Sequence, residues 1–305
     1  MRIVYLGTPD FAVLPLEKII SSGREVVGVV TNKDKPVGRK RVLTAPPVKV
    51  VAQSHGIPVF QYDKIRVEGV QDLINLAPDI MITCAFGQIL SQEILDIPKL
   101  GVINIHASLL PKYRGASPIH YAILNGEKVT GITIMKTDIG IDTGDILLEK
   151  PLEIKSDETC GQLFERLSDL GADSIIEALE LIENGKASFI KQNDEQASFS
   201  KIITKELAKI DWNNDAVNIY NQIRAFNPSP VAYCLLEGQP FKIYQAKVVN
   251  SSGKPGEILV ADKNLVVACG NNALSLEVVQ KSGGKQMAIK DFLLGNRFIV
   301  GEELK

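Results

Sequence analysis

The hydrophobic positions in the first half of the chain follow two periods that alternate along the sequence. Short, nearly continuous apolar runs predict buried strands, and stretches with an apolar residue every three or four positions predict amphipathic helices. The predicted strands are residues 2–6, 25–31, 58–60, 79–85, 101–105, 129–135 and 146–154. The predicted helices are residues 10–22, 46–55, 67–76, 115–124 and 160–183. This alternation favours an α/β fold, a Rossmann-like and mostly parallel sheet with helices on both faces.

The pattern changes after about residue 190. Residues 191–201 are polar and show no periodicity, and a predicted helix at 213–226 ends before a proline. Strand-like runs separated by turn residues follow at 231–236, 241–249, 256–261, 265–269 and 274–280. Runs this short, about 8–12 residues apart, indicate a small β-barrel or sandwich. We therefore expect one domain at 1–190, a linker at 191–204 and a smaller domain at 205–305.

Composition and charge narrow the class of protein. The chain has 305 residues, of which 45% are hydrophobic and 23% are charged, as in a folded protein with a large core. The scattered cysteines form no CxxC pair, which argues against a disulfide scaffold and a structural zinc site and favours a reduced, cytoplasmic protein. We find no pattern of a secretory signal peptide and no apolar run of the length that spans a bilayer. The formal net charge of −2 argues against a generic nucleic-acid binder.

The first turn of the chain, Gly7-Thr8-Pro9-Asp10, joins a predicted strand to a predicted helix. It lacks the GxGxxG fingerprint, so dinucleotide binding is not supported. Two interpretations remain open. The turn is either a helix cap with proline in the first turn, or a backbone contact to a substrate at the crevice where the strand order of such sheets reverses.

The densest chemical signal lies between residues 101 and 145. Asn104 and His106 alternate along one predicted strand, so they face the same side, and they lie near the end where open α/β sheets bind ligands. Asp142 follows in a loop rich in aspartate and glycine. Histidine moves protons near neutral pH, asparagine donates to an oxyanion, and aspartate orients an imidazole. No serine or cysteine lies in a nucleophile elbow, so the set suits direct acyl-type transfer through a tetrahedral intermediate.

The pattern alone leaves a second interpretation of His106, a core histidine whose hydrogen bonds are satisfied internally. The other two histidines have structural interpretations only. His55 lies at a predicted helix end and is expected to cap it, and His120 lies within a predicted helix and is expected to pack. A metal site is not expected, because one histidine and isolated carboxylates give no ligand spacing.

One arrangement of residues resembles the folate-dependent formyltransferases. It consists of Asn104-Ile-His106, then Ser108-Leu109-Leu110-Pro111, and Asp142 at 38 positions after Asn104. Two further segments are similar to those of the family members that act on methionyl initiator tRNA: Gly7–Ala12 and Pro36-Val-Gly-Arg39-Lys40-Arg41. A second β-rich domain is also similar to theirs. The resemblance covers both domains.

The resemblance implies formyl transfer from N10-formyltetrahydrofolate, as co-substrate, to the α-amino group of methionine on initiator tRNA. It implies that Asn104, His106 and Asp142 are catalytic, and that Ser108, Leu109, Leu110 and Pro111 bind the folate. It also implies an OB-like, tRNA-binding barrel at 205–305, and that Arg39, with Lys40 and Arg41 beside it, contacts the tRNA. We expect a monomer without a metal. The alternatives are a formyltransferase acting on an amino sugar or glycinamide ribonucleotide, a hydrolase that releases formate, and a non-catalytic RNA- or nucleotide-binding protein.

The charge is unevenly distributed along the chain. Residues 31–50 carry six lysines and arginines against one aspartate, and residues 205–305 carry twelve against ten acids. The basic stretch follows the second predicted strand, so it is expected to rim the crevice that holds His106. It is either a solvated surface or a contact for RNA phosphates. Trp212 is expected to pack in the core or at a domain interface rather than to stack on a base.

Overall fold

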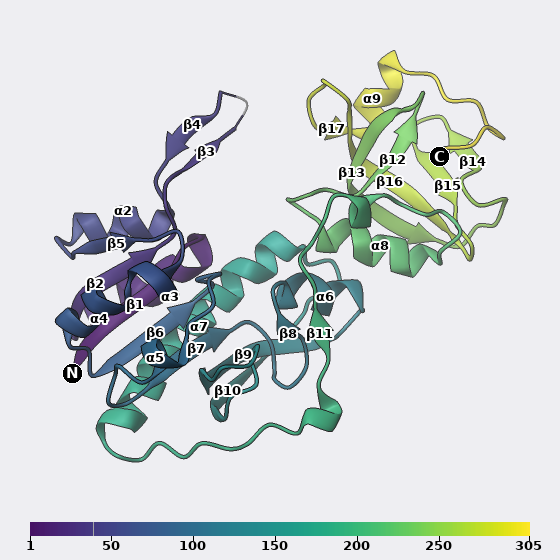
Figure 1. The fold of residues 1–305 in the computed structure, drawn as a ribbon. Coiled ribbons are helices and arrows are strands. Elements are labelled where there is room, and N and C mark those ends of the chain that lie inside the picture. The colour runs from purple at the N-terminus through teal and green to yellow at the C-terminus, as the bar shows by residue number, and fades with distance from the viewer. Residues whose placement is uncertain (39) are drawn as a thin grey trace. The chain divides into compact units, whose positions relative to one another are not determined.

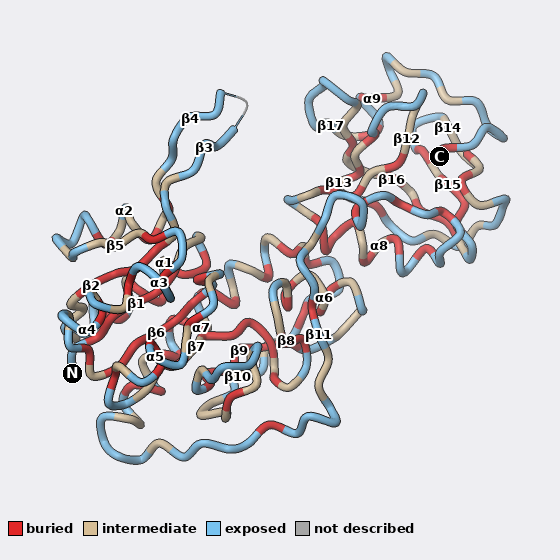
Figure 2. The backbone as a smooth tube through the Cα atoms, viewed as in Figure 1, coloured by how far each residue is buried: buried red, intermediate tan, exposed pale blue. Residues whose placement is uncertain are grey.

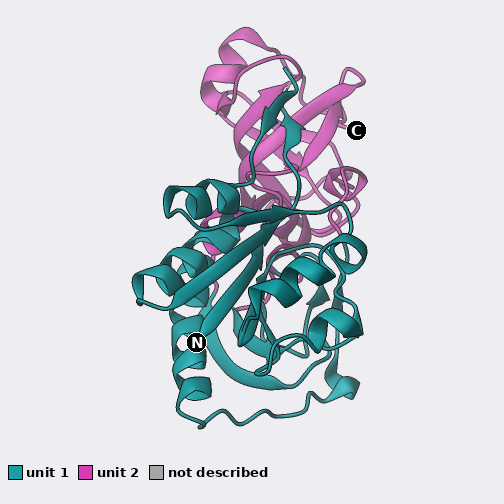
Figure 3. Cartoon of the chain, turned by 60° about the vertical axis from the view of Figure 1, so that its left-hand side comes forward, with its two compact units in different colours: residues 1–118, 129–153, 164–201 teal, residues 119–128, 154–163, 202–305 magenta. Residues whose placement is uncertain are grey.

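The structure, a computed structural model, describes residues 1–38 and 40–305, which form two compact units (Figure 1 and Figure 3). The first unit comprises Met1–Pro118, Val129–Glu153 and Phe164–Lys201. The second comprises Ile119–Lys128, Ile154–Leu163 and Ile202–Lys305. The domain borders expected from the sequence, at residues 190 and 205, stay a prediction.

A seven-stranded sheet organises the first unit. Its strands are β1 (Arg2–Gly7), β2 (Glu25–Thr31), β5 (Val59–Gln61), β6 (Ile80–Cys84), β7 (Val102–His106), β9 (Val129–Lys136) and β10 (Ile146–Glu153), in the order β10-β9-β7-β6-β1-β2-β5. The five strands from β5 to β7 are parallel, and β9 pairs antiparallel with both β7 and β10. The expected mostly parallel sheet is therefore confirmed. All five residues of β6 are buried, as a strand covered on both faces requires (Figure 2).

Helices connect these strands, most of them where the apolar spacing predicts. They are α1 (Val13–Ser21), α2 (Pro47–Ser54), α3 (Ile65–Glu68), α4 (Val70–Leu76), α5 (Gln92–Leu95), α6 (Pro118–Leu124) and α7 (Cys160–Glu183), and the 3-10 turns η1 (Asp10–Ala12) and η2 (Asp194–Gln196) add to them. The helix expected at 67–76 is interrupted at Gly69, which packs closely under Tyr62. The helix expected from residue 115 starts at Pro118, because β8 (Arg114–Gly115) pairs with β11 (Phe199–Ser200) instead.

The basic stretch after β2 forms a hairpin of its own. Strands β3 (Lys35–Val37) and β4 (Val42–Thr44) pair antiparallel with each other and with no strand of the large sheet (Figure 1). All six of their residues are exposed. The sequence predicts only an irregular excursion here, because strands that bury nothing carry no hydrophobic alternation.

The second unit contains an antiparallel sheet in the order β12-β13-β16-β15-β14, with β17 on β16. Its elements are η3 (Glu206–Ala208), α8 (Ala216–Ala225), β12 (Tyr233–Leu236), β13 (Gln239–Val249), β14 (Ile258–Ala261), β15 (Leu265–Ala268), β16 (Ala273–Lys281), β17 (Met287–Ala288) and α9 (Ile289–Gly295). Residues 301–305 hydrogen-bond to β14 through Ile258 and to β12 through Leu235. This segment links the two edge strands, so the sheet curls into the expected OB-like barrel. Among the described residues, none of the helices combines the length and apolar composition that a membrane crossing needs.

Candidate functional site

Strand β7 positions two of the predicted site residues from the middle of the sheet. Asn104 is register partner to Thr83 on β6, and the Thr83 hydroxyl donates a 2.9 Å hydrogen bond to the Asn104 side-chain oxygen. This bond fixes the orientation of the amide, so its NH2 group turns the other way, toward Asp142. The distance from Asn104 Nδ2 to Asp142 Oδ1 is 3.4 Å.

His106 ends β7 and is buried, with only 6% of its side chain exposed. Its Nε2 lies 3.0 Å from the backbone oxygen of Tyr113. A carbonyl oxygen only accepts hydrogen bonds, so Nε2 carries a proton. On the other side of the ring, Nδ1 lies 3.6 Å from Asp142 Oδ2. Both neighbours of the imidazole are therefore hydrogen-bond acceptors, one on each side of the ring.

Asp142 belongs to the loop between β9 and β10, and its backbone is left-handed with φ +53°. Aspartate is one of the few non-glycine residues that tolerate this conformation. Its Oδ2 accepts a 2.8 Å hydrogen bond from the Gly115 backbone N–H, and the side chain is 18% exposed. Two positions further, Gly144 approaches the backbone so closely that a Cβ there would lie 1.8 Å from the Lys136 oxygen. The loop is thus held tightly with the carboxylate turned toward β7.

The segment Ser108–Pro111 follows His106 directly and is held from beneath by Thr133 of β9. The Thr133 hydroxyl donates to the Ser108 backbone oxygen at 2.6 Å and accepts from the Leu110 N–H at 3.1 Å. Ser108 is fully buried and its hydroxyl donates to the Lys112 oxygen at 2.7 Å. Leu110 is buried, whereas Leu109 and Pro111 are partly exposed. A ligand can therefore contact the backbone of this segment and the side chains of Leu109 and Pro111.

The hairpin formed by β3 and β4 carries the remaining predicted site residues. Lys40 and Arg41 are exposed, and Arg39 lies outside the described residues. Two further lysines of the basic stretch are neutralised, Lys33 by Asp63 and Lys49 by Asp34. Within residues 1–38 and 40–305, no acidic partner is found for Lys40 or Arg41. The hairpin follows the carboxyl end of β2, the same sheet edge at which β7 ends.

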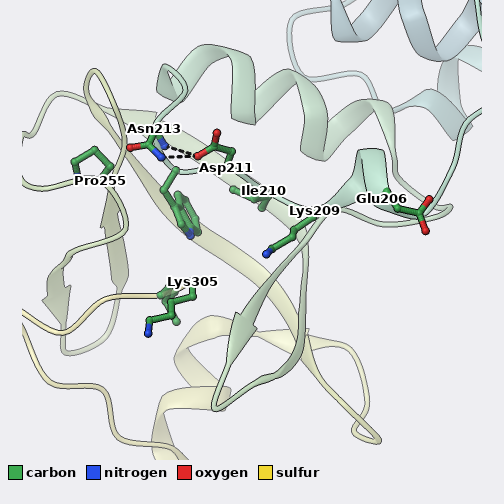
Figure 4. Close-up of a pocket in the computed structure, with 9 residues that line it drawn as sticks. Glu206, Lys209, Ile210, Asp211, Asn213, Pro255 and Lys305 are labelled. Atoms are coloured by element: carbon green, nitrogen blue, oxygen red, sulfur yellow. Dashed lines mark hydrogen bonds between the residues drawn. The ribbon is translucent and has the colours of Figure 1, made fainter.

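The second unit has a groove of about 450 Å³ beside η3 and the C-terminal segment (Figure 4). Trp212 lines it and is 5% exposed, as its expected packing role requires, but its indole N–H has no hydrogen-bond partner among the described residues. The Asp211 carboxylate at the rim accepts from Asn213. Of the other two histidines, His55 is the C-cap residue of α2, and His120 on α6 contacts Phe226 with ring centroids 6.4 Å apart.

Two residues near the site carry no assigned role in the sequence interpretation, Arg114 and Gln192. Both are buried, at 3% and 5% exposure, and they hydrogen-bond to each other. Arg114 stands within the conspicuous stretch that follows His106, which is a weak signal. Gln192 lies in a polar stretch without periodicity, so nothing in the sequence distinguishes it. In the described part of the chain, no group of three or more His, Cys, Asp or Glu side chains is arranged to hold a metal ion.

The mostly parallel sheet with Asn, His and Asp at its carboxyl edge, followed by a separate barrel, defines a two-domain group-transfer enzyme. The family model "Formyl transferase" matches residues 1–179, and "Formyl transferase, C-terminal domain" matches residues 202–297. The chain belongs to the formyl transferase family.

Two relatives within that family carry the same name. The chain is 47% identical to the methionyl-tRNA formyltransferase of Alkaliphilus oremlandii, covering 100% of this chain and 99% of that protein. It is 45% identical to the methionyl-tRNA formyltransferase of Geobacter sulfurreducens, covering 100% and 96%. The fold is also similar to the crystal structure of an N-formyltransferase from Helicobacter canadensis in complex with folinic acid and dTDP-3-aminofucose. That likeness has a TM-score of 0.67 at 23% identity and covers 92% of this chain and 98% of the other.

Proposed function

We propose that this protein transfers the formyl group of N10-formyltetrahydrofolate to the α-amino group of methionine on initiator tRNA, which yields N-formylmethionyl-tRNA for translation initiation. The observation that carries the proposal is the convergence of Asn104 and His106 on Asp142 at the carboxyl edge of β7. The chain is 45–47% identical to methionyl-tRNA formyltransferases over its whole length, which supports Met-tRNA and a formyl-folate donor as the substrates of that site. The sugar-bound neighbour shares only the fold at 23% identity, so it does not favour an amino-sugar acceptor.

Stabilisation of a developing oxyanion is the role we assign to Asn104 and His106. When the amine attacks the formyl carbon, the formyl oxygen gains negative charge in a tetrahedral intermediate. The Asn104 amide is aimed by Thr83 and keeps an N–H for this oxygen, and a protonated His106 adds a positive charge beside it. A single oriented donor of this kind contributes about 3–4 kcal/mol to a rate.

Proton transfer is the role we assign to Asp142. The attacking amine loses a proton, and the leaving N10 of the folate gains one as its bond to the formyl carbon breaks. The Asp142 carboxylate lies between His106 and Asn104 and is partly exposed, so it can hold the imidazolium and relay this proton. The Ser108 hydroxyl is buried and bonded to a carbonyl, which supports direct transfer without a covalent enzyme intermediate.

Binding of the folate is the role we assign to Ser108, Leu109, Leu110 and Pro111. Thr133 fixes this segment immediately beside His106, which would place a bound donor next to the catalytic residues. Contact with tRNA is the role we assign to Arg39, Lys40 and Arg41 on the hairpin and, more broadly, to the barrel at 205–305. Lys40 and Arg41 are exposed and have no acidic partner among the described residues, so they are free to bind RNA phosphates.

We also propose that the protein is a cytoplasmic monomer. All four cysteines are buried free thiols. Unpaired thiols are usual in reducing compartments, where disulfides rarely persist.

The direct test incubates the protein with N10-formyltetrahydrofolate and Met-tRNA and follows formylmethionyl-tRNA. Asn104→Ala and His106→Ala are expected to lower kcat at least 100-fold, the loss typical of an oxyanion donor. Near-wild-type turnover in either variant would remove the role assigned to that residue. Formylation of a dTDP-amino sugar but not of Met-tRNA, or release of formate alone, would overturn the proposed function.

The tRNA contact is tested separately with Arg39→Ala, Lys40→Ala and Arg41→Ala. Each is expected to raise the KM for Met-tRNA while leaving the KM for the folate unchanged, because the hairpin is assigned to RNA phosphates. Lys99→Ala is the matched control, since Lys99 is exposed and precedes β7 at the opposite edge of the sheet. Equal KM values for Met-tRNA in the three variants and the control would refute the contact.

A further inference from the structure

Residues 190–200, which follow α7, run beside the loops that hold the candidate catalytic residues, and we refer to them as the 190–200 segment. At its start, the Ile190 and Ile146 backbones exchange two 2.8 Å hydrogen bonds next to the Asp142 loop. At its end, β11 pairs with β8, directly after Tyr113. The segment therefore touches both the loop that carries Asp142 and the residue that binds His106.

Gln192 is the buried centre of this segment, and all hydrogen-bonding positions of its side chain are used. Its Nε2 donates to the backbone oxygens of Asp142, at 2.9 Å, and of Gly144, at 2.7 Å. Its Oε1 accepts from Arg114 Nε at 3.0 Å and from Nη2 of the same guanidinium at 2.8 Å. Arg114 only donates and backbone oxygens only accept, so the amide has a single possible orientation.

Glutamine is the residue that these four bonds require. Glutamate has the same length and would still accept from Arg114, but it would turn a carboxylate oxygen toward two carbonyl oxygens. Asparagine is shorter by one methylene and could not span both sides. The guanidinium also donates to the Asp194 carboxylate at 2.7 Å, so a second bond holds it on the Oε1 side of Gln192.

The other end of the segment acts on His106. The Ser198 hydroxyl accepts a 2.9 Å hydrogen bond from the Tyr113 N–H, and the Tyr113 oxygen holds His106 Nε2. Tyr113 and Asp142 both have left-handed backbones, at φ +61° and +53°, a conformation that few side chains favour. Both residues thus hydrogen-bond to the same segment: the Asp142 oxygen accepts from Gln192, and the Tyr113 N–H donates to Ser198.

We propose that Gln192 is a positioning residue for formyl transfer: through the Asp142 and Gly144 carbonyls it sets the distance between the Asp142 carboxylate and the imidazole of His106. The inference rests on the proposed function of that site. It assigns a role in the reaction to residues that the sequence predicts as a linker. Displacing reacting groups by about 1 Å can cost 100-fold in rate.

The test compares Gln192→Glu and Gln192→Ala with Gln196→Glu, a matched control in the same segment whose side chain is exposed. For each protein, kcat per folded molecule and both KM values are measured, with the folded fraction taken from near-UV circular dichroism and thermal unfolding. Both Gln192 variants are expected to lose about 10- to 100-fold in kcat. The KM values for the folate and Met-tRNA should stay within threefold, and the control should match wild type.

A second measurement separates positioning from general loss of structure. The chain has three histidines, so the imidazole nitrogen resonances of a 15N-histidine sample can be assigned with single substitutions. Gln192→Glu should shift the His106 resonances and leave those of His55 and His120 in place. Turnover within twofold of wild type in both Gln192 variants, unchanged His106 resonances, or losses that follow the unfolded fraction would each overturn the inference. Absence of Met-tRNA formylation by the wild-type protein would instead contradict the proposed function.

Discussion

Replacing Asp142 with asparagine should slow formyl transfer while leaving its loop folded. Asparagine tolerates the left-handed backbone at this position as well as aspartate does. Its oxygen can still accept from the Gly115 N–H, the shortest contact of the carboxylate at 2.8 Å. In that orientation its NH2 group meets the NH2 of Asn104, so a hydrogen bond becomes a contact between two donors, and the negative charge beside His106 is lost.

The magnitude follows from the distance between Asp142 Oδ2 and His106 Nδ1, which is 3.6 Å. Two unit charges at this separation attract by about 4.6 kcal/mol at an effective dielectric constant of about 20. Part of this energy is already present before the reaction and does not contribute to the rate. We therefore expect a loss of about 2.7–4.1 kcal/mol in transition-state stabilisation, which is about 100- to 1000-fold in kcat.

The assay is steady-state formylation of Met-tRNA by Asp142→Asn, with Asp138→Asn as the matched control. Asp138 lies in the same loop and its Oδ1 accepts from the Gly140 N–H and the Thr143 hydroxyl, contacts that an asparagine oxygen preserves. The control should keep wild-type kcat. A kcat of Asp142→Asn within threefold of wild type would refute the electrostatic role, as would an equal loss in the control.

Three further outcomes follow from the same structure. Gly144→Ala should lower the free energy of unfolding, measured by urea titration, by about 1–3 kcal/mol, because its Cβ would press on the Lys136 oxygen. In the control Gly295→Ala the new Cβ meets no atom within 4 Å, so the free energy of unfolding should change little. Burial lowers the pKa of His120 in the folded protein, so the unfolded chain takes up a proton first as the pH drops below about 6.5. The free energy of unfolding should therefore fall there, by at most about 1.4 kcal/mol per pH unit. The His120→Gln variant should show a flatter dependence of stability on pH. Burial raises the pKa of each thiol to about 12, so a disulfide reagent at pH 8 should label none in the native protein and four in guanidinium: Cys84, Cys160, Cys234 and Cys269.

The parts of the fold that bury apolar residues were predictable from the sequence. The run at 79–85 predicts β6, because a strand covered on both faces needs no polar position. The hairpin gives no such signal. Its Val37, Val42 and Leu43 are 56%, 59% and 68% exposed, so their apolar character does not report burial.

The candidate site divides in the same way. The alternation of Asn104 and His106 predicts a shared face, and both side chains do approach Asp142. The pairing of Arg114 with Gln192 was not predictable, because it joins positions 78 residues apart in the chain. Local sequence patterns encode which face of an element is buried, whereas the partner of a buried polar group depends on the tertiary fold.

The net charge of −2 does not conflict with RNA as a substrate, because charges act locally in salt solution. The screening length is about 8 Å at physiological ionic strength, so acidic residues elsewhere on the chain do little to offset the hairpin. The number of unpaired cations also matters more than the total number of lysines and arginines. Lys33 forms an ion pair with Asp63 and Lys49 with Asp34, so these two lysines contribute less to binding RNA. Among the described residues of this basic stretch, the cations without an acidic partner are Lys35, Lys40 and Arg41, and all three lie on the exposed hairpin. We therefore assign the RNA contact to this exposed, locally basic segment despite the acidic balance of the whole chain.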